Sequence, residues 1–174
     1  IGNPPYVKLQ NFRRVLADQA EYLVSARKED GTPQYESTQT GNFDIYLPFI
    51  ERGVELLNED GKLGYIAPSV WLKNEYGKGL RGFLSKTGSL GRWVDFKSFQ
   101  VFSEAMTYTA IQFFEGSHQT HVRFTNAPKG VIDVDWDASS SQIELTQLDD
   151  HKGWAFVGKA ERRLFQKLAS SCGQ

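Results

Sequence analysis

The stretch Asp44–Pro68, DIYLPFIERGVELLNEDGKLGYIAP, decides the fold class. Its first part predicts a helix over 44–58, because apolar side chains recur at helical spacing and Pro48 falls where a first turn tolerates proline. Asp60-Gly61 is typical of the turn that ends such a helix. The apolar run that follows predicts a short buried strand over 62–68. A helix, a tight turn and a buried strand in this order indicate an α/β sheet.

The neighbouring segments extend this α/β pattern. Apolar residues at helical spacing predict a helix over 11–28, capped by Asn11, and another over 75–86. Strands are expected over 90–96 and 107–114, where β-branched and aromatic residues gather. The link between these two strands is too short for a crossover helix, so we expect them to be antiparallel.

The remaining segments are less regular. Residues 29–42 are rich in Gly, Pro, Thr, Ser and charge and predict a long loop. Val122 and Phe124 indicate one strand and residues 131–136 a second, joined by the turn Pro128-Lys129-Gly130. A helix is expected within residues 154–168, after an aromatic pair.

Composition sets outer limits. The chain has 174 residues, enough for one domain, and a formal net charge of −1, so no global basic field would hold nucleic acid. A single cysteine, Cys172, excludes an internal disulfide and fits a reducing cytoplasm. The sequence shows no run that predicts a membrane span and no signal peptide. Because it starts at Ile1 without Met, inside a motif, we expect it to be a piece of a larger protein.

Asn3-Pro4-Pro5-Tyr6 predicts a rigid loop that presents hydrogen-bond acceptors beside an aromatic wall. Neither proline has a backbone N–H, and each holds the preceding residue extended. The loop therefore exposes carbonyl oxygens, and Asn3 adds its amide oxygen. These acceptors suit a group with two N–H donors, such as the exocyclic amino group of a base, whose flat face Tyr6 could cover.

This tetrapeptide resembles the catalytic motif of amino-directed DNA methyltransferases. The segments GNFDIYLPFIERGVELLNEDGKLGYIAPSVWLKNEYGKGLRGFL and VDFKSFQVFSEAMTYTAIQFF are similar to the adenine-N6 enzymes of restriction–modification systems, especially the large type IIG-like enzymes. The resemblance covers Ile1–Glu115. It implies an α/β, partial Rossmann-like sheet of the class I methyltransferases, ending in an antiparallel hairpin. Residues 1–116 would be the C-terminal half of the catalytic domain, and residues 117–174 a hairpin and helix leading to a target-recognition domain.

The resemblance also implies an activity. A methyl group would pass from S-adenosyl-L-methionine to N6 of an adenine flipped out of double-stranded DNA, without a metal. Asn3, Pro4, Pro5 and Tyr6 would be the catalytic residues, Tyr6 and Phe102 would stack on the target base, and Asn3 and Pro5 would touch the cofactor. The main cofactor site, in the N-terminal half, and the target-recognition domain would lie outside this chain. We therefore expect the isolated piece of this bacterial cytoplasmic enzyme to bind the cofactor weakly and to be inactive.

Other functions remain open on the sequence alone. The same motif serves N4-cytosine methylation and methylation of amino groups in protein glutamine or RNA. The fold could also persist as a non-catalytic binding or scaffolding module. Phe102 could also be an aromatic that packs in the core or the hairpin. An Asn-Pro-x-Tyr peptide ligand is disfavoured, because the motif adjoins a globular chain.

Three further patterns favour structural interpretations. Gly77 to Gly82 fits the dinucleotide pattern G-x-G-x-x-G, but no strand directly precedes it and it carries the apolar face of a helix. A second set has calcium-loop spacing but holds alanine where the loop needs glycine: Asp133, Asp135, Asp137, Ser139, Ser141 and Glu144. A third set could contact phosphate but fits a solvated helix face better: Lys73, Lys78, Arg81 and Lys86.

Overall fold

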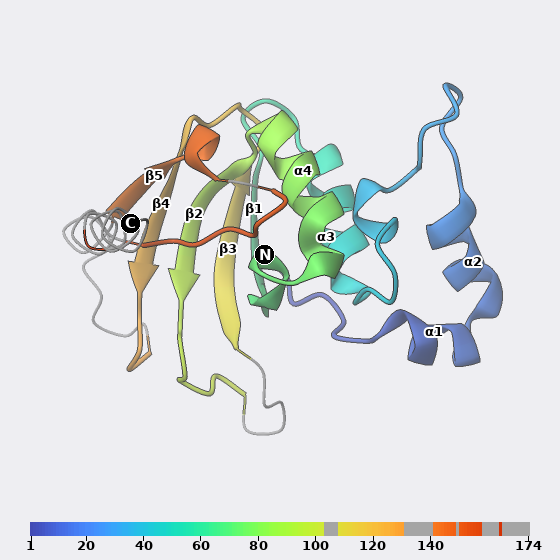
Figure 1. Cartoon of the computed structure of the whole chain (residues 1–174), viewed down its shortest axis with the longest axis horizontal. Coiled ribbons are helices and arrows are strands. Elements are labelled where there is room, and N and C mark those ends of the chain that lie inside the picture. The colour runs from blue at the N-terminus through green and yellow to red at the C-terminus, as the bar shows by residue number, and fades with distance from the viewer. Residues whose placement is uncertain (103–107, 131–140, 149, 158–163, 165–174) are drawn as a thin grey trace, which may run out of the picture.

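A five-stranded sheet forms the centre of the protein (Figure 1). The computed structural model describes residues 1–102, 108–130, 141–148, 150–157 and 164. The strands follow the spatial order β1-β3-β2-β4-β5. Their bounds are β1 (Lys62–Pro68), β2 (Leu90–Asp95), β3 (Thr109–Glu115), β4 (His121–Asn126) and β5 (Ser141–Glu144).

Strand directions place three strand ends at one edge of the sheet. β3 lies between β1 and β2 and is antiparallel to both, which confirms the expected antiparallel pair. β2 is parallel to β4, and β4 is antiparallel to β5. β1, β2 and β4 therefore run in one direction, and their carboxyl ends meet at a shared edge. β5 was not predicted, and it pairs with β4. Its first and last residues, Ser141 and Glu144, belong to the set with calcium-loop spacing.

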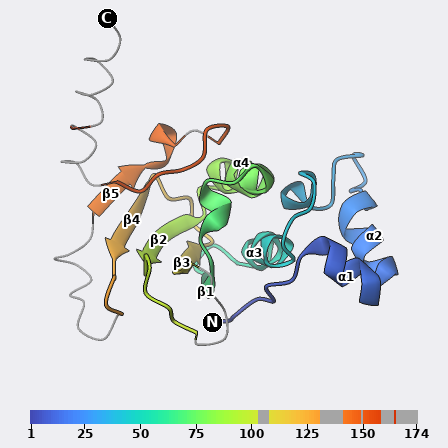
Figure 2. The ribbon, with the colours of Figure 1, turned by 60° about the horizontal axis from the view of Figure 1, so that its bottom comes forward.

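Two helices, α3 (Tyr46–Glu55) and α4 (Lys78–Thr87), cover one face of the sheet (Figure 2). As expected, Pro48 lies in the first turn of α3. Short 3-10 helices join the other segments, and two of them, η2 (Val70–Leu72) and η3 (Glu75–Gly77), connect β1 to α4. Two more are η1 (Glu36–Thr38) and η4 (Leu145–Gln147).

The predicted helix over 11–28 is wrong in its continuity and in its cap, because the first helix begins at Leu9 and Asn11 lies inside it. The chain instead forms α1 (Leu9–Val15) and α2 (Ala17–Ser25), which break at Leu16, where φ is −134° and ψ is 67°. The break costs no hydrogen bond at this residue, because its N–H still donates to Phe12 O (2.8 Å) and its oxygen accepts from Ala20 N–H (3.0 Å). The bend directs Phe12 and Leu23 into one apolar hollow of about 520 Å³ beside α3.

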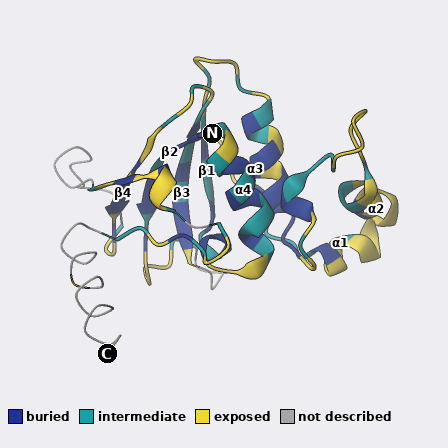
Figure 3. Cartoon of the chain, turned by 45° about the horizontal axis from the view of Figure 1, so that its top comes forward, coloured by how far each residue is buried: buried dark blue, intermediate teal, exposed yellow. Residues whose placement is uncertain are grey.

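The core lies between the sheet and its two helices. Figure 3 shows this layer as buried, whereas much of α1 and α2 is exposed. Trp71 is fully buried and meets Trp93 and Trp154 edge to face, with ring centroids 5.7 and 5.8 Å apart. Trp154 belongs to an irregular segment rather than to the helix expected within 154–168, most of which lies outside the described residues.

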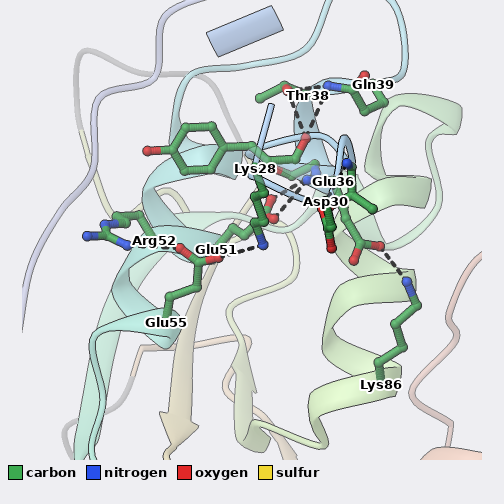
Figure 4. A network of polar contacts seen from close by, with 12 residues as sticks. Lys28, Asp30, Glu36, Thr38, Gln39, Glu51, Arg52, Glu55 and Lys86 are labelled. Atoms are coloured by element: carbon green, nitrogen blue, oxygen red, sulfur yellow. Dashed lines mark hydrogen bonds and ion pairs between the residues drawn. The ribbon is translucent and has the colours of Figure 1, made fainter. Parts of the chain in front are cut away.

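The segment predicted as a long loop, 29–42, is anchored over part of its length (Figure 4). Its η1 turn lies against α3 and α4, where the buried Glu51 carboxylate accepts the backbone N–H groups of Glu36 and Ser37, both at 2.8 Å. Lys86 of α4 also bonds the Glu36 carboxylate, at 2.7 Å. The η1 turn is therefore held by hydrogen bonds to α3 and an ion pair to α4, and it is not an open loop.

Some expectations fall outside the described residues. These include the strand over 131–136 and four members of the calcium pattern, Asp133, Asp135, Asp137 and Ser139. Within the described part of the chain, no three His, Cys, Asp or Glu side chains are grouped to hold a metal. No helix in that same part has the length and apolar character needed to cross a membrane.

Candidate functional site

The Asn3-Pro4-Pro5-Tyr6 loop starts where the first residues of the chain pair with β1. Gly2 forms a parallel bridge with Tyr65: its N–H donates to Gly64 O (2.9 Å), and its oxygen accepts from Ile66 N–H (3.1 Å). A Cβ on Gly2 would lie 2.8 Å from the Tyr65 ring, so glycine permits this close approach. The segment runs parallel to β1, so the loop emerges at the edge where β1, β2 and β4 end.

A second bridge holds the chain just after the loop. Lys8 pairs antiparallel with Asp44: Leu9 N–H donates to Phe43 O (2.9 Å), and Ile45 N–H donates to Val7 O (2.8 Å). The side chains of Lys8 and Asp44 form an ion pair at 2.7 Å. The loop is therefore held at both ends by backbone hydrogen bonds to different elements.

Exposure differs along the loop. Asn3 and Pro5 are exposed and Tyr6 is half-buried, but Pro4 is buried, contrary to the expectation that the loop exposes its carbonyl oxygens. Asn3 is thus accessible from outside the protein. Asn3 and Pro5, the two residues expected to touch a cofactor, are both accessible from outside the protein.

Tyr6 is fixed by its hydroxyl and by its ring. The hydroxyl donates to Ile66 O at 2.9 Å, which ties the side chain to the end of β1. Its ring meets that of Tyr46 edge to face, with centroids 6.2 Å apart. Burial raises the pKa of Tyr6 to about 12 and also raises the pKa of Tyr46, so both phenols are neutral at physiological pH.

The structure places Phe102 against Tyr6, although both rings were expected to stack on a base. The two rings meet edge to face, with centroids 6.4 Å apart and an interplanar angle of 65°. A base held between two parallel rings needs about 7 Å, two contacts of about 3.5 Å each. The rings therefore touch one another here and leave no slot for a base between them.

The structure confirms the structural interpretation of the glycine-rich pattern. Gly77 belongs to η3, and Gly79 and Gly82 to α4. A Cβ on Gly77 would lie 1.9 Å from Trp71 O, and one on Gly79 would lie 2.1 Å from Glu36 O. These two glycines permit close backbone packing, so protein atoms already occupy the space that a phosphate would need.

One member of the set that could contact phosphate is used inside the protein. Arg81 is buried, and its guanidinium donates to the backbone oxygens of Trp71 (2.6 Å) and Asn74 (2.9 Å). Lys86 pairs with Glu36. Arg81 therefore fits neither a phosphate contact nor the solvated helix face favoured for it, because it is buried and backbone carbonyl oxygens accept from its guanidinium.

Sequence reasoning missed the residues that support the loop from behind. Lys8, Asp44 and Tyr46 contact the loop or its continuation, and Tyr76 lies under Lys8, whose Nζ is 4.6 Å from the ring centroid. Asp44 and Tyr46 fall in the stretch that predicts a helix, and nothing in that pattern indicates a contact with the loop. Pairing between residues 7–9 and 43–45 has no signal in a single sequence, since no turn connects them.

A sheet in which β3 is inserted antiparallel between β1 and β2, with the motif loop at the carboxyl edge, belongs to the partial Rossmann-like methyltransferase class. Solved structures share this fold. A type IIG restriction endonuclease, BpuSI, superposes with a TM-score of 0.53 at 15% identity, over 82% of this chain and 18% of that one. A modification subunit of a putative type I restriction enzyme from Vibrio vulnificus gives 0.53 at 12% identity, over 83% of this chain and 33% of that one.

Sequence comparison makes the assignment specific. The Eco57I restriction-modification methylase model matches residues 1–102, and the chain belongs to this family. The type II restriction enzyme and methyltransferase RM.Eco57I of Escherichia coli is 36% identical over 124 residues, 71% of this chain and 12% of that protein. The type II methyltransferase M.XhoI of Xanthomonas vasicola is 37% identical over 116 residues, 66% of this chain and 19% of that protein. The chain thus spans less than a fifth of either relative.

Proposed function

We propose that the protein containing this chain transfers a methyl group from S-adenosyl-L-methionine to N6 of an adenine in double-stranded DNA, within a restriction–modification system. The observation that carries the proposal is the exposed Asn3 at the carboxyl edge of the sheet, beside a Tyr6 ring fixed by Ile66. Membership of the Eco57I methylase family supports it.

The loop supplies the acceptors that this reaction needs. The amino lone pair of adenine is conjugated into the ring and is a poor nucleophile. Hydrogen bonds from that amino group to the Asn3 side-chain oxygen and the Pro4 carbonyl would draw its nitrogen toward tetrahedral geometry. They would also stabilise the positive charge that grows on it in the transition state. Two acceptors without a competing N–H are what a proline-rich loop provides.

When bound, the cofactor supplies a methyl group already activated by its positive sulfur, so the protein needs neither a metal nor a covalent intermediate. Within this chain, Asn3 and Pro5 are the exposed residues we propose to touch it. We propose that the rest of its site and the target-recognition domain lie in the parts of the longer protein that correspond to the unmatched length of the relatives.

We propose that Tyr6 and Phe102 stack on the flipped base. Because their rings are now in edge-to-face contact, Phe102 must turn aside before the base can lie against Tyr6. Stacking on an aromatic ring contributes about 1–3 kcal/mol per base. In the intact enzyme, Phe102→Ala should reduce the fluorescence rise of 2-aminopurine at the target position while leaving cofactor affinity unchanged. An undiminished fluorescence signal would exclude Phe102 from the stack.

Nucleoside mass spectrometry tests the proposed reaction. The intact gene would be expressed in a host without its own DNA methylation, beside the Asn3→Ala variant. We expect N6-methyladenine in the wild-type DNA and its loss in the variant. N4-methylcytosine alone would overturn the adenine assignment. Unmodified DNA from a folded, DNA-binding wild-type protein would instead favour a non-catalytic scaffold.

A further inference from the structure

We propose that the Lys8–Asp44 ion pair is a positioning device for the Asn3-Pro4-Pro5-Tyr6 loop, with Tyr76 as its support. The inference rests on the proposed function of the loop and adds residues that the motif does not contain. Lys8 and Asp44 would touch neither substrate nor cofactor. They would act by fixing where Asn3 and Tyr6 stand at the edge of the sheet.

The two attachments of the loop differ in kind. At its start, Gly2 is held by β1 through backbone hydrogen bonds alone. At its end, the backbone bridge between Lys8 and Asp44 is reinforced by the ion pair between their side chains, at 2.7 Å. Only Asn3 to Val7 lie between the two bridges. A displacement of Lys8 would therefore also displace Asn3 and Tyr6.

The ion pair is partly shielded from solvent, with the Lys8 side chain 42% exposed and the Asp44 side chain 12% exposed. Asp44 as a whole residue is 8% exposed, and the Lys8 ammonium lies 4.6 Å from the centroid of the Tyr76 ring, within the range of a cation–π contact. Tyr76 is held in turn, because its backbone oxygen accepts a hydrogen bond from the Thr40 hydroxyl at 2.8 Å. The Lys28–Glu55 pair is longer, at 3.5 Å, which makes it a useful comparison.

The segment that carries Asp44 contacts the loop and its continuation at three consecutive residues. Asp44 pairs with Lys8, Ile45 N–H donates to Val7 O, and the Tyr46 ring packs edge to face on Tyr6. This segment leads directly into α3, which packs on the sheet. These contacts connect the start of α3 to Tyr6. The ion pair between Lys8 and Asp44 holds the two segments together.

Amide hydrogen exchange of the 174-residue chain tests the clamp without reference to catalysis. Lys8→Met and Asp44→Asn remove one charge each and nearly preserve side-chain size, and Lys28→Met is the matched control. We expect protection of the Leu9 and Ile45 amides to fall about tenfold in each single variant and little further in the double variant, because a charge-assisted hydrogen bond is worth on this order. Unchanged protection, or an equal loss in the control, would overturn the proposal.

Kinetics of the intact enzyme then test the positioning role. We expect each variant to lower the single-turnover methyl-transfer rate about tenfold, with KM for the cofactor nearly unchanged, because reacting groups misplaced by about 1 Å lose rate rather than affinity. A raised KM at a constant rate would contradict this role. Absence of methyl transfer in the wild-type enzyme would count against the proposed function alone, since the exchange experiment still decides whether the clamp exists.

Discussion

Two segments of this protein match known ligand-binding patterns, and their surroundings give them opposite meanings. Asn3-Pro4-Pro5-Tyr6 leaves Asn3 and Pro5 exposed at the edge of the sheet. Gly77 to Gly82 places its first two glycines against the carbonyl oxygens of Trp71 and Glu36. The comparison teaches that a pattern can bind a ligand only when its atoms face free space. Where neighbouring backbone fills that space, the same residues serve packing.

The largest expected effect on stability belongs to the glycine segment. Gly79→Ala would place a Cβ 2.1 Å from Glu36 O, a backbone atom that cannot turn aside. Overpacking of this kind costs about 1–3 kcal/mol, and we expect the upper end of that range. Gly82→Ala is the matched control, because its Cβ would meet nothing within 4 Å. It should stabilise the helix by about 0.5–1 kcal/mol. Urea unfolding of both variants measures the contrast, and equal stabilities would show that Gly79 is not a packing residue.

The next largest expected loss of stability comes from Glu51, whose carboxylate holds the Glu36 backbone that faces Gly79. Glu51→Gln leaves one side-chain oxygen for the two N–H groups of Glu36 and Ser37 and turns an amide N–H₂ toward the other. A buried donor left without a partner costs about 1–3 kcal/mol. Thermal unfolding should show the loss, whereas Glu55→Gln, at a more exposed ion pair, should change stability by less than about 0.5 kcal/mol. A stable Glu51→Gln variant would mean that η1 is held by other contacts.

A smaller effect is expected at Tyr6, the half-buried residue of the motif. Tyr6→Phe removes the hydrogen bond to Ile66 O, which should cost about 0.5–1.5 kcal/mol. The pKa of Tyr6 is raised from 10.0 to about 12 in the folded protein, so the unfolded chain ionises first. Wild-type stability relative to the variant is therefore greatest below pH 10 and falls as the pH rises toward 12. Unfolding free energies of both proteins between pH 8 and about 11 would reveal this slope, and parallel curves would contradict it.

The sequence predicted the regular parts of the sheet well. β1 has the predicted bounds. An Asp-Gly turn precedes its apolar run and Pro68 ends it, so both ends of the strand are marked in the sequence. The start of α3 and the antiparallel pairing of β2 and β3 follow from equally local signals. Asn3 is exposed, as the acceptor loop requires, but the contact between the Phe102 and Tyr6 rings was not predicted, because stacking on a base needs space for that base.

Features that depend on distant contacts were not predictable in this way. The break at Leu16 keeps the two backbone hydrogen bonds of that residue, and the apolar spacing in the sequence gives no sign of it. The η1 turn is fixed by Glu51, a carboxylate that in sequence belongs to the polar side of a helix. β5 is short and needs β4 as a partner. The burial of Pro4 depends in the same way on the fold around the loop.

The central claim is that the Asn3 side-chain oxygen accepts a hydrogen bond from the target amino group in the transition state. Single-turnover methyl transfer by the intact enzyme, wild type against Asn3→Ala, tests it most directly. Losing one preorganised hydrogen-bonding partner costs about 2.7–4 kcal/mol, so the rate should fall about 10²–10³-fold. DNA affinity and the unfolding midpoint should stay unchanged, because Asn3 is exposed. A rate within about threefold of wild type, or a loss explained by unfolding, would contradict the account.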